Sequence, residues 1–126
     1  MKFEIVASAA APKAVGPYSP AVAAGETLYC SGQLGIDPTS GELESGVKAQ
    51  AERAITNLRA LLAAANLTLG DVAKTTIFLA DMADFALVNE VYASFFATPY
   101  PARSTIQVAA LPLKARVEIE AIAVRR

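Results

Sequence analysis

The chain has 126 residues, a formal net charge of −1 and 54% hydrophobic residues, a size typical of a single domain covering residues 1–126. Charges of both signs are scattered without a basic stripe, which argues against nucleic acid as a partner. The sequence has no histidine, which excludes Ser-His-Asp and Cys-His catalysis and histidine-bound zinc, so an enzyme here must use carboxylates, hydroxyls, arginine, backbone groups and water.

The first part of the chain indicates strands separated by turns. Residues 2–6 alternate polar and apolar side chains, which predicts a short strand. Residues 16–20, Gly-Pro-Tyr-Ser-Pro, contain too many turn formers for regular structure. Apolar residues 21–24 and 27–32 flank a Gly-Glu pair and predict a β-hairpin.

A long amphipathic helix follows over about residues 47–65. Its apolar side chains recur at steps of three and four residues, so they form one face. Ser45 is a candidate for the N-cap, and Asn66 suits the C-terminal end. The β-branched residues 72–79 then predict a strand.

The second helix carries an apolar stripe and is followed by two strands. Asp81 and Asp84 offer caps for its start. The strands are predicted over residues 104–109 and 116–124. The stripe consists of Phe85, Val88, Tyr92 and Phe95.

The C-terminal region carries the candidate chemistry. Pro101 stiffens the approach to Arg103, whose guanidinium can present a planar fork of donors to a carboxylate. Glu118 and Glu120 lie two residues apart in an apolar strand, so both point to one face. A carboxylate there costs free energy unless it is paired or functional. These residues indicate a small anionic ligand and acid–base chemistry.

The order of the elements predicts an α+β fold with two helices on one face of a mixed sheet. The other face still carries Val, Ile and Ala, so we expect contacts with sister subunits. No apolar run reaches membrane-spanning length. The single cysteine, Cys30, is predicted to be a buried, inert thiol. No signal-peptide pattern is present, so the expected location is cytoplasmic.

The chain resembles the RidA/YjgF family of imine deaminases over residues 16–126. No one motif is specific, but their order, spacing and the total length are. The motifs are Gly16-Pro17-Tyr18, Ser31-Gly32-Gln33, Lys74-Thr75-Thr76-Ile77-Phe78-Leu79, Asn89, Pro101-Ala102-Arg103-Ser104 and Glu118-Ile119-Glu120-Ala121-Ile122-Ala123-Val124.

The resemblance implies a chorismate-mutase-like fold with a mixed, mostly antiparallel sheet, assembled as a homotrimer with clefts between subunits. It implies hydrolysis of 2-imino or enamine acids, such as 2-iminobutanoate and 2-iminopropanoate, to 2-oxo acids and ammonia, with no cofactor and no metal. Arg103 matches the family's carboxylate-binding arginine, and Glu118 matches its acidic residue near the attacking water. Tyr18, Ser31, Gly32 and Asn89 match substrate-binding positions.

Thr105 is a departure from the family pattern, because many relatives carry cysteine at this position. A threonine cannot supply a thiolate. Its backbone N–H and C=O remain available to hold substrate or water, so imine hydrolysis stays possible. The departure bears on the substrate range and leaves the expected reaction unchanged.

Several alternatives remain open from the sequence. Arg103 could be a surface arginine ending a loop, and Glu118 could be a structural acid paired with Arg116, Lys114 or another subunit. Burial would raise the pKa of Glu118, whereas a nearby Arg103 would lower it. The whole chain could instead be a regulatory module that binds a 2-oxo acid, a ribonuclease or translation inhibitor, or a purely structural trimer.

Overall fold

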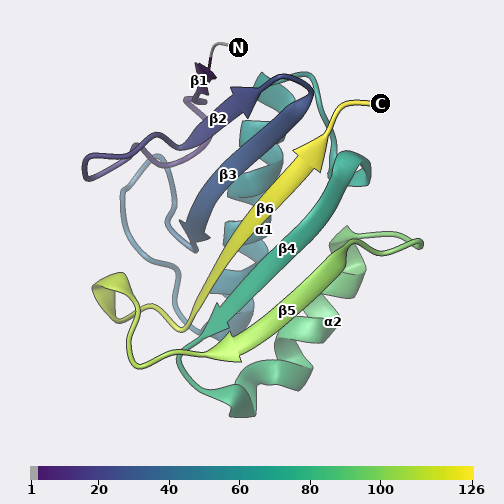
Figure 1. Cartoon of the computed structure of the whole chain (residues 1–126). Coiled ribbons are helices and arrows are strands. Elements are labelled where there is room, and N and C mark those ends of the chain that lie inside the picture. The colour runs from purple at the N-terminus through teal and green to yellow at the C-terminus, as the bar shows by residue number, and fades with distance from the viewer. Residues whose placement is uncertain (1–2) are drawn as a thin grey trace.

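The structure is a computed structural model that describes residues 3–126. A six-stranded sheet is covered on one face by two helices (Figure 1). Three short 3₁₀ turns lie at Leu69–Asp71, Met82–Asp84 and Pro112–Lys114. The main elements are β1 (Phe3–Val6), β2 (Ala21–Ala24), β3 (Thr27–Leu34), α1 (Val47–Ala64), β4 (Val72–Leu79), α2 (Phe85–Phe95), β5 (Ala102–Gln107) and β6 (Val117–Val124).

The sheet has the strand order β1-β2-β3-β6-β4-β5. All neighbouring strands are antiparallel except β4 and β5, which α2 connects as a β-α-β unit. The predicted mixed, mostly antiparallel sheet is therefore confirmed. The predicted hairpin is also present, and Gly25 at its turn has a φ of 61°, a conformation that favours glycine.

The core lies between the sheet and the two helices, as the apolar periodicity of α1 predicts. Leu58, Leu61 and Leu62 of α1 are fully buried in this core, and α1 packs against β3 and β6. Burying each such side chain contributes roughly 1.5–3 kcal/mol. Burial raises the pKa of the Cys30 thiol to about 12, in agreement with the expected inert cysteine.

The ends of α1 agree only in part with the sequence prediction. The N-cap is Gly46, with a φ of 87° and no side-chain capping bond, so the prediction that Ser45 caps the helix is wrong. The C-terminal prediction is confirmed, because Asn66 follows the C-cap with a φ of 60°. Asparagine adopts this left-handed conformation more readily than most residues.

The start of α2 uses its two aspartates differently from the prediction. Asp81 caps the preceding 3₁₀ turn by accepting a hydrogen bond from the backbone N–H of Ala83. Asp84 occupies the N-cap position of α2 but makes no capping bond. Its carboxylate instead accepts two bonds of 2.9 Å from the guanidinium of Arg116. The aspartate thus ties the helix to the segment that leads into β6.

The second face of the sheet is not covered by any helix (Figure 1). On β6, Val117 and Ile119 are buried toward the helices, while Glu118 and Glu120 alternate with them onto the open face. Tyr29 and Ile106 also leave half of their surface exposed. Neither helix within residues 3–126 combines the length and the apolar character needed to cross a membrane.

Candidate functional site

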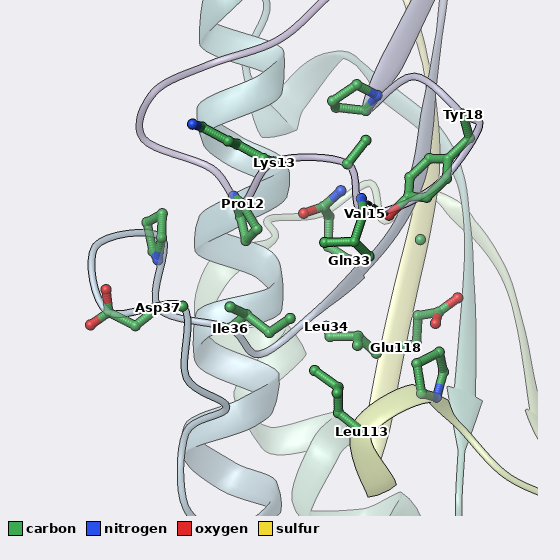
Figure 2. Close-up of a pocket in the computed structure, with 16 residues that line it drawn as sticks. Pro12, Lys13, Val15, Tyr18, Gln33, Leu34, Ile36, Asp37, Leu113 and Glu118 are labelled. Carbon is green, nitrogen blue, oxygen red and sulfur yellow. Dashed lines mark hydrogen bonds between the residues drawn. The ribbon is translucent and has the colours of Figure 1, made fainter.

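Glu118 lies in a cavity of about 600 Å³ on the open side of the sheet. Figure 2 shows its carboxylate beneath the Tyr18 ring, with Leu34 and Leu113 beside it. The walls come from the loop before β2, from β3 and the turn after it, and from the turn that enters β6. Tyr18, Gly32 and Glu118, predicted as separate site residues, therefore share one cavity.

A β-bulge gives Glu118 its place in this cavity. The pairing of β3 with β6 shifts register between Cys30 and Gln33, which leaves an extra residue in β3. A Cβ atom at Gly32 would lie 2.7 Å from Cδ of Glu118, closer than carbon atoms can approach. A side chain at position 32 would therefore displace the Glu118 carboxyl group.

The carboxyl group of Glu118 has a raised pKa. Burial raises the pKa of its carboxyl group, and the negative charge of Glu120 raises that pKa further. Within residues 3–126 its carboxylate makes no hydrogen bond or ion pair, and Arg116 is engaged by Asp84. The pairing of Glu118 with Arg116, one of the alternatives from the sequence, is therefore absent from the chain.

Ser31 attaches the Tyr18 loop to the sheet. Its hydroxyl donates a hydrogen bond of 2.6 Å to the carbonyl of Ser19, and its backbone N–H donates to the carbonyl of Pro20. The Tyr18 hydroxyl accepts a bond from the N–H of Val15 at 3.4 Å, while the ring stays half exposed. Ser31 thus holds the segment that carries Tyr18, and its hydroxyl proton is already used.

Two buried amides on α1 fix the floor of the cavity. The side-chain N–H₂ of Asn57 donates to the carbonyls of Leu34 and Ile36, at 3.1 and 2.9 Å. Gln50 accepts a 2.8 Å bond from the N–H of Arg116, two residues before Glu118. Buried amides with such partners are costly to remove. The helix therefore sets the position of the end of β3 and of the segment that enters β6.

Arg103 lies in a second hollow, of about 420 Å³, formed by α2 and the segment before β5. The strand β5 begins at Ala102 and ends at Gln107, two residues earlier at each end than predicted. Arg103 is thus part of the edge strand rather than of a loop that precedes it. The other residues that line this hollow are Asn89, Tyr92, Ala93, Tyr100 and Pro101.

The Arg103 guanidinium is held by aromatic rings. Its Cζ atom lies 4.9 Å from the centroid of Tyr92 and 5.8 Å from that of Phe85. Tyr92 is itself fixed by a 2.8 Å hydrogen bond between its hydroxyl and that of Thr75. In the described part of the chain the guanidinium makes no hydrogen bond or ion pair. Its donor edges are therefore free for an anionic ligand.

Thr105 lies on the same face of β5 as Arg103, two residues further along the strand. Its hydroxyl oxygen is buried and has no hydrogen-bond partner within residues 3–126. β5 is the outer strand of the sheet, so one of its edges is not paired with another strand of the chain. This arrangement is compatible with a polar ligand against the backbone of Thr105.

The structure does not bring Arg103 and Glu118 into one cavity. Arg103 pairs with Thr75 on β4, and Thr75 pairs with Ala121 on β6. All three side chains therefore lie on the helix-covered face, whereas Glu118 points to the open face. Arg103, Asn89 and Thr105 form one group, and Tyr18, Ser31, Gly32 and Glu118 form the other. A ligand could touch both groups only where two copies of the chain meet.

Two residues that support the hollows were not selected from the sequence. Tyr92 appeared only as part of the apolar stripe of α2, although its ring supports Arg103. Asn57 lies among the apolar residues of α1, which were interpreted only as a packing face, and it is completely buried. A polar residue on the apolar face of a helix was the one signal that could have identified it.

Comparison with known proteins places the chain in a family. The model described as Endoribonuclease L-PSP matches residues 8–125. A 2-iminobutanoate/2-iminopropanoate deaminase from Bos taurus is 51% identical over 123 residues, which cover 97% of this chain and 90% of the relative.

Solved structures agree with this assignment. RidA from an Antarctic Psychrobacter has a TM-score of 0.95 and 49% identity, covering 96% of this chain and 98% of that chain. E. coli TdcF with bound serine has a TM-score of 0.94 and 45% identity, covering 98% of this chain and 99% of that chain. The chain therefore belongs to the RidA/YjgF family, which the Endoribonuclease L-PSP model describes.

Proposed function

We propose that the chain is a hydrolytic deaminase of 2-imino and enamine acids, giving 2-oxo acids and ammonia without a cofactor. The observation that carries this proposal is a pair of hollows, one with an unpaired guanidinium and one with a half-buried carboxyl group of raised pKa. The identity of about half of all residues to a relative named 2-iminobutanoate/2-iminopropanoate deaminase supports it.

Arg103 binds the non-reacting end of the substrate. A 2-imino acid carries a carboxylate next to the carbon that reacts, and a guanidinium can hold it with two parallel hydrogen bonds. Stacking on Tyr92 limits the motion of the Arg103 side chain before substrate arrives. Asn89 lines the same hollow and supplies a further polar contact, and the backbone of Thr105 lies two residues further along β5. The serine bound in the E. coli relative is also a small molecule with a carboxylate.

Glu118 moves the proton. With the imine nitrogen protonated, water adds to the C=N carbon as the Glu118 carboxylate accepts one of its protons, which forms a C–O bond and leaves a hydroxyl group and an amine on the same carbon. The protonated carboxyl group then donates its proton to the amine nitrogen. The C–N bond breaks as the hydroxyl group returns a proton to the carboxylate, so the products are ammonia and a 2-oxo acid. A raised pKa suits both steps, because it makes the carboxylate a stronger base for the water and brings the group closer to the pH at which it can also return the proton. Tyr18 and the Ser31–Gly32 bulge shape the surroundings of this water.

The complete site forms between copies of the chain. Arg103 and Glu118 occupy opposite faces of the sheet, so an Arg103 hollow must meet the Glu118 cavity of a neighbouring copy. The apolar residues left on the open face, such as Tyr29 and Ile106, support assembly through this face. A homotrimer with three such clefts satisfies both conditions. The cytoplasmic location expected from the sequence stays a prediction.

A coupled reaction tests the activity. A threonine dehydratase converts threonine into an enamine that becomes 2-iminobutanoate and then 2-oxobutanoate. We expect the purified chain to shorten the delay before 2-oxobutanoate appears, in proportion to the amount added. An unchanged delay, with 2-oxobutanoate binding measured by calorimetry, would favour the regulatory binding module instead.

The description of the family model also names an endoribonuclease. RNA cleavage has little support in this chain, because it has no histidine and a net charge of −1. Incubating the protein with labelled RNA tests this alternative. Cleavage that survives further purification and is lost in Arg103→Ala would support a ribonuclease that uses the same hollow.

A further inference from the structure

Thr75 lies in the motif of residues 74–79, to which the proposed reaction assigns no role. It belongs to β4, near the middle of the sheet, and its side chain is fully buried toward the helices. Valine has almost the same shape, suits a strand equally well and carries no polar group that burial would leave without water. A threonine at this position therefore needs an explanation other than packing.

The buried hydroxyl group of Thr75 is paired with that of Tyr92. The two oxygen atoms lie 2.8 Å apart, and the bond joins β4 to α2. Burial raises the pKa of the Tyr92 hydroxyl group. The phenol therefore stays protonated at neutral pH and keeps this bond without becoming an anion that would pair with Arg103.

The ring of Tyr92 is fixed at two points. The bond to Thr75 holds the hydroxyl end of the ring, and Phe96 stacks against the ring with centroids 4.3 Å apart and an angle of 20° between the planes. The Cζ atom of Arg103 lies 4.9 Å from the centroid of the same ring. Because a guanidinium is attracted to the face of an aromatic ring, the position of the Tyr92 ring sets the position of the Arg103 guanidinium.

Thr75 also lies beside the main chain of Arg103. The parallel pairing of β4 with β5 places Thr75 opposite Arg103, so the strand residue that bonds Tyr92 is also the register partner of the arginine. Thr75, Tyr92 and Arg103 thus form a closed unit. Arg103 depends on such support because β5 is the outer strand of the sheet. A guanidinium held in place loses less freedom when it binds a carboxylate.

We propose that Thr75 is a positioning residue for carboxylate binding, which acts through Tyr92 to hold the Arg103 guanidinium in the orientation that a carboxylate requires. This inference rests on the proposed function only in taking Arg103 as the carboxylate-binding residue. Thr75 itself is buried and does not touch the ligand. Its contribution is the same before and during the reaction, so its loss should raise KM and leave kcat almost unchanged.

Two substitutions at Thr75 separate the hydroxyl group from the packing of the side chain. Thr75→Val keeps the shape and removes the hydroxyl group, whereas Thr75→Ser keeps the hydroxyl group and loses a buried methyl group. The probe is 2-oxobutanoate, a stable carboxylate, with Kd measured by calorimetry on the assembled protein. We expect Thr75→Val to raise Kd about five- to tenfold and Thr75→Ser to change it less than about twofold. Thr75→Ser should still unfold at lower urea concentration than wild type.

Tyr92→Phe removes the same hydrogen bond from its other end. It should raise Kd by about the same factor as Thr75→Val. The double variant Thr75→Val/Tyr92→Phe leaves no buried hydroxyl group unpaired, so it should regain stability relative to Thr75→Val. Its affinity should stay low, because the ring is still not held. A purely structural role for Thr75 predicts instead that affinity returns together with stability.

A second background tests whether Thr75 acts through Arg103. Lysine has no planar group that a ring could orient. Thr75→Val should therefore change Kd less than about twofold when it is added to Arg103→Lys. Thr56→Val is the matched control, since the Thr56 hydroxyl group donates a 2.8 Å bond to the carbonyl of Glu52 within α1 and lines neither hollow. It should leave Kd unchanged.

Four results would overturn the inference. Thr75→Val could bind 2-oxobutanoate as tightly as wild type, Thr75→Ser could lose as much affinity as Thr75→Val, the double variant could regain affinity with stability, or wild type could fail to bind the probe. The fate of the proposed function is separate. If the expected binding pattern were found in a protein that does not accelerate imine hydrolysis, the deaminase proposal would fail and the positioning role of Thr75 would stand.

Discussion

Arg103 illustrates how one side chain can be fixed without an ion pair. Its guanidinium stacks against Tyr92 and leaves its donor edges free. Arg103→Lys keeps the charge but loses the planar fork, so kcat/KM for 2-iminobutanoate should fall about ten- to a hundredfold. Steady-state kinetics in the dehydratase-coupled assay measures this effect.

Arg59 provides the control for that substitution. Its Cζ atom lies 5.4 Å from the Phe95 centroid, so it also stacks on a ring of α2, but it does not line the Arg103 hollow. Arg59→Lys should leave the kinetics unchanged. Equal losses in both variants would mean that stacking on α2, rather than carboxylate binding, explains the Arg103 effect.

The ionised Glu118 carboxylate should lower the free energy of unfolding while it is needed for activity. A carboxyl group with a raised folded-state pKa costs stability once it is ionised. This cost is absent below its ordinary pKa of 4.5 and grows as pH rises toward the folded-state pKa. Glu118→Gln should therefore unfold at higher urea concentration than wild type at neutral pH, with no difference at low pH. The same variant should lose about a hundredfold or more in kcat.

Glu120→Gln separates the charge effect from burial. Glu120 is exposed, and its charge is the second cause of the raised Glu118 pKa. Its removal should lower that pKa and move the acidic limb of the kcat/KM profile to lower pH. A shift to higher pH would show that Glu118 is not the group that titrates in this limb.

At the scale of the elements, two glycines allow the effects on function and on packing to be separated. Gly32 lies in β3, and Gly35 lies in the turn after it. A Cβ at Gly32 would meet the flexible Glu118 side chain, whereas one at Gly35 would lie 2.8 Å from the backbone carbonyl carbon of Gln50 in α1. Gly35→Ala should lower the free energy of unfolding by about 1–3 kcal/mol, because the helix backbone cannot yield easily. Gly32→Ala should cost less stability but most of the activity.

Urea denaturation and the imine assay on both variants make this comparison. The reverse pattern, with Gly32→Ala unstable yet active, would show that the Glu118 carboxyl group can move without harm to the reaction.

Patterns within short stretches of sequence predicted the helices and strands well. The placement of the site residues depends on how distant strands pair, which such patterns do not contain. Apolar periodicity identified α1 and α2, and alternation placed Glu118 and Glu120 on one face. Capping failed at Ser45 because Gly46 takes the cap position with a positive φ. The opposite placement of Arg103 and Glu118 depends on the register of β4 with both β5 and β6. Such a register joins residues distant in sequence, so no local pattern reveals it.

At the scale of the whole molecule, Arg103 and Glu118 lie on opposite faces of the sheet, so one copy of the chain does not complete the proposed site. The proposed assembly uses the helix-covered edge of one copy and the open face of the next. Contact between copies in the proposed assembly would account for the exposure of Tyr18, Leu113 and Ile106 in a single copy. It also ties activity to association, so activity per chain should fall when the protein is diluted below the dissociation constant of the assembly.

Mixing two inactive variants tests the shared site directly. Arg103→Ala copies still carry Glu118, and Glu118→Gln copies still carry Arg103. After refolding together in equal amounts, about a quarter of clefts should combine an intact Arg103 with an intact Glu118, which restores about a quarter of wild-type activity. Each variant refolded alone should stay inactive. If both residues acted within one chain, the mixture would also stay inactive.

The converse mixture supplies the matched control. Wild type refolded with an equal amount of the Arg103→Ala/Glu118→Gln double variant should show, per total chain, about a quarter of wild-type activity if each cleft draws on two copies, and about half if each copy carries its own site. This fraction does not depend on how many copies close the ring, because each cleft samples only two of them. The two mixtures together therefore identify a site shared between copies without assuming a trimer.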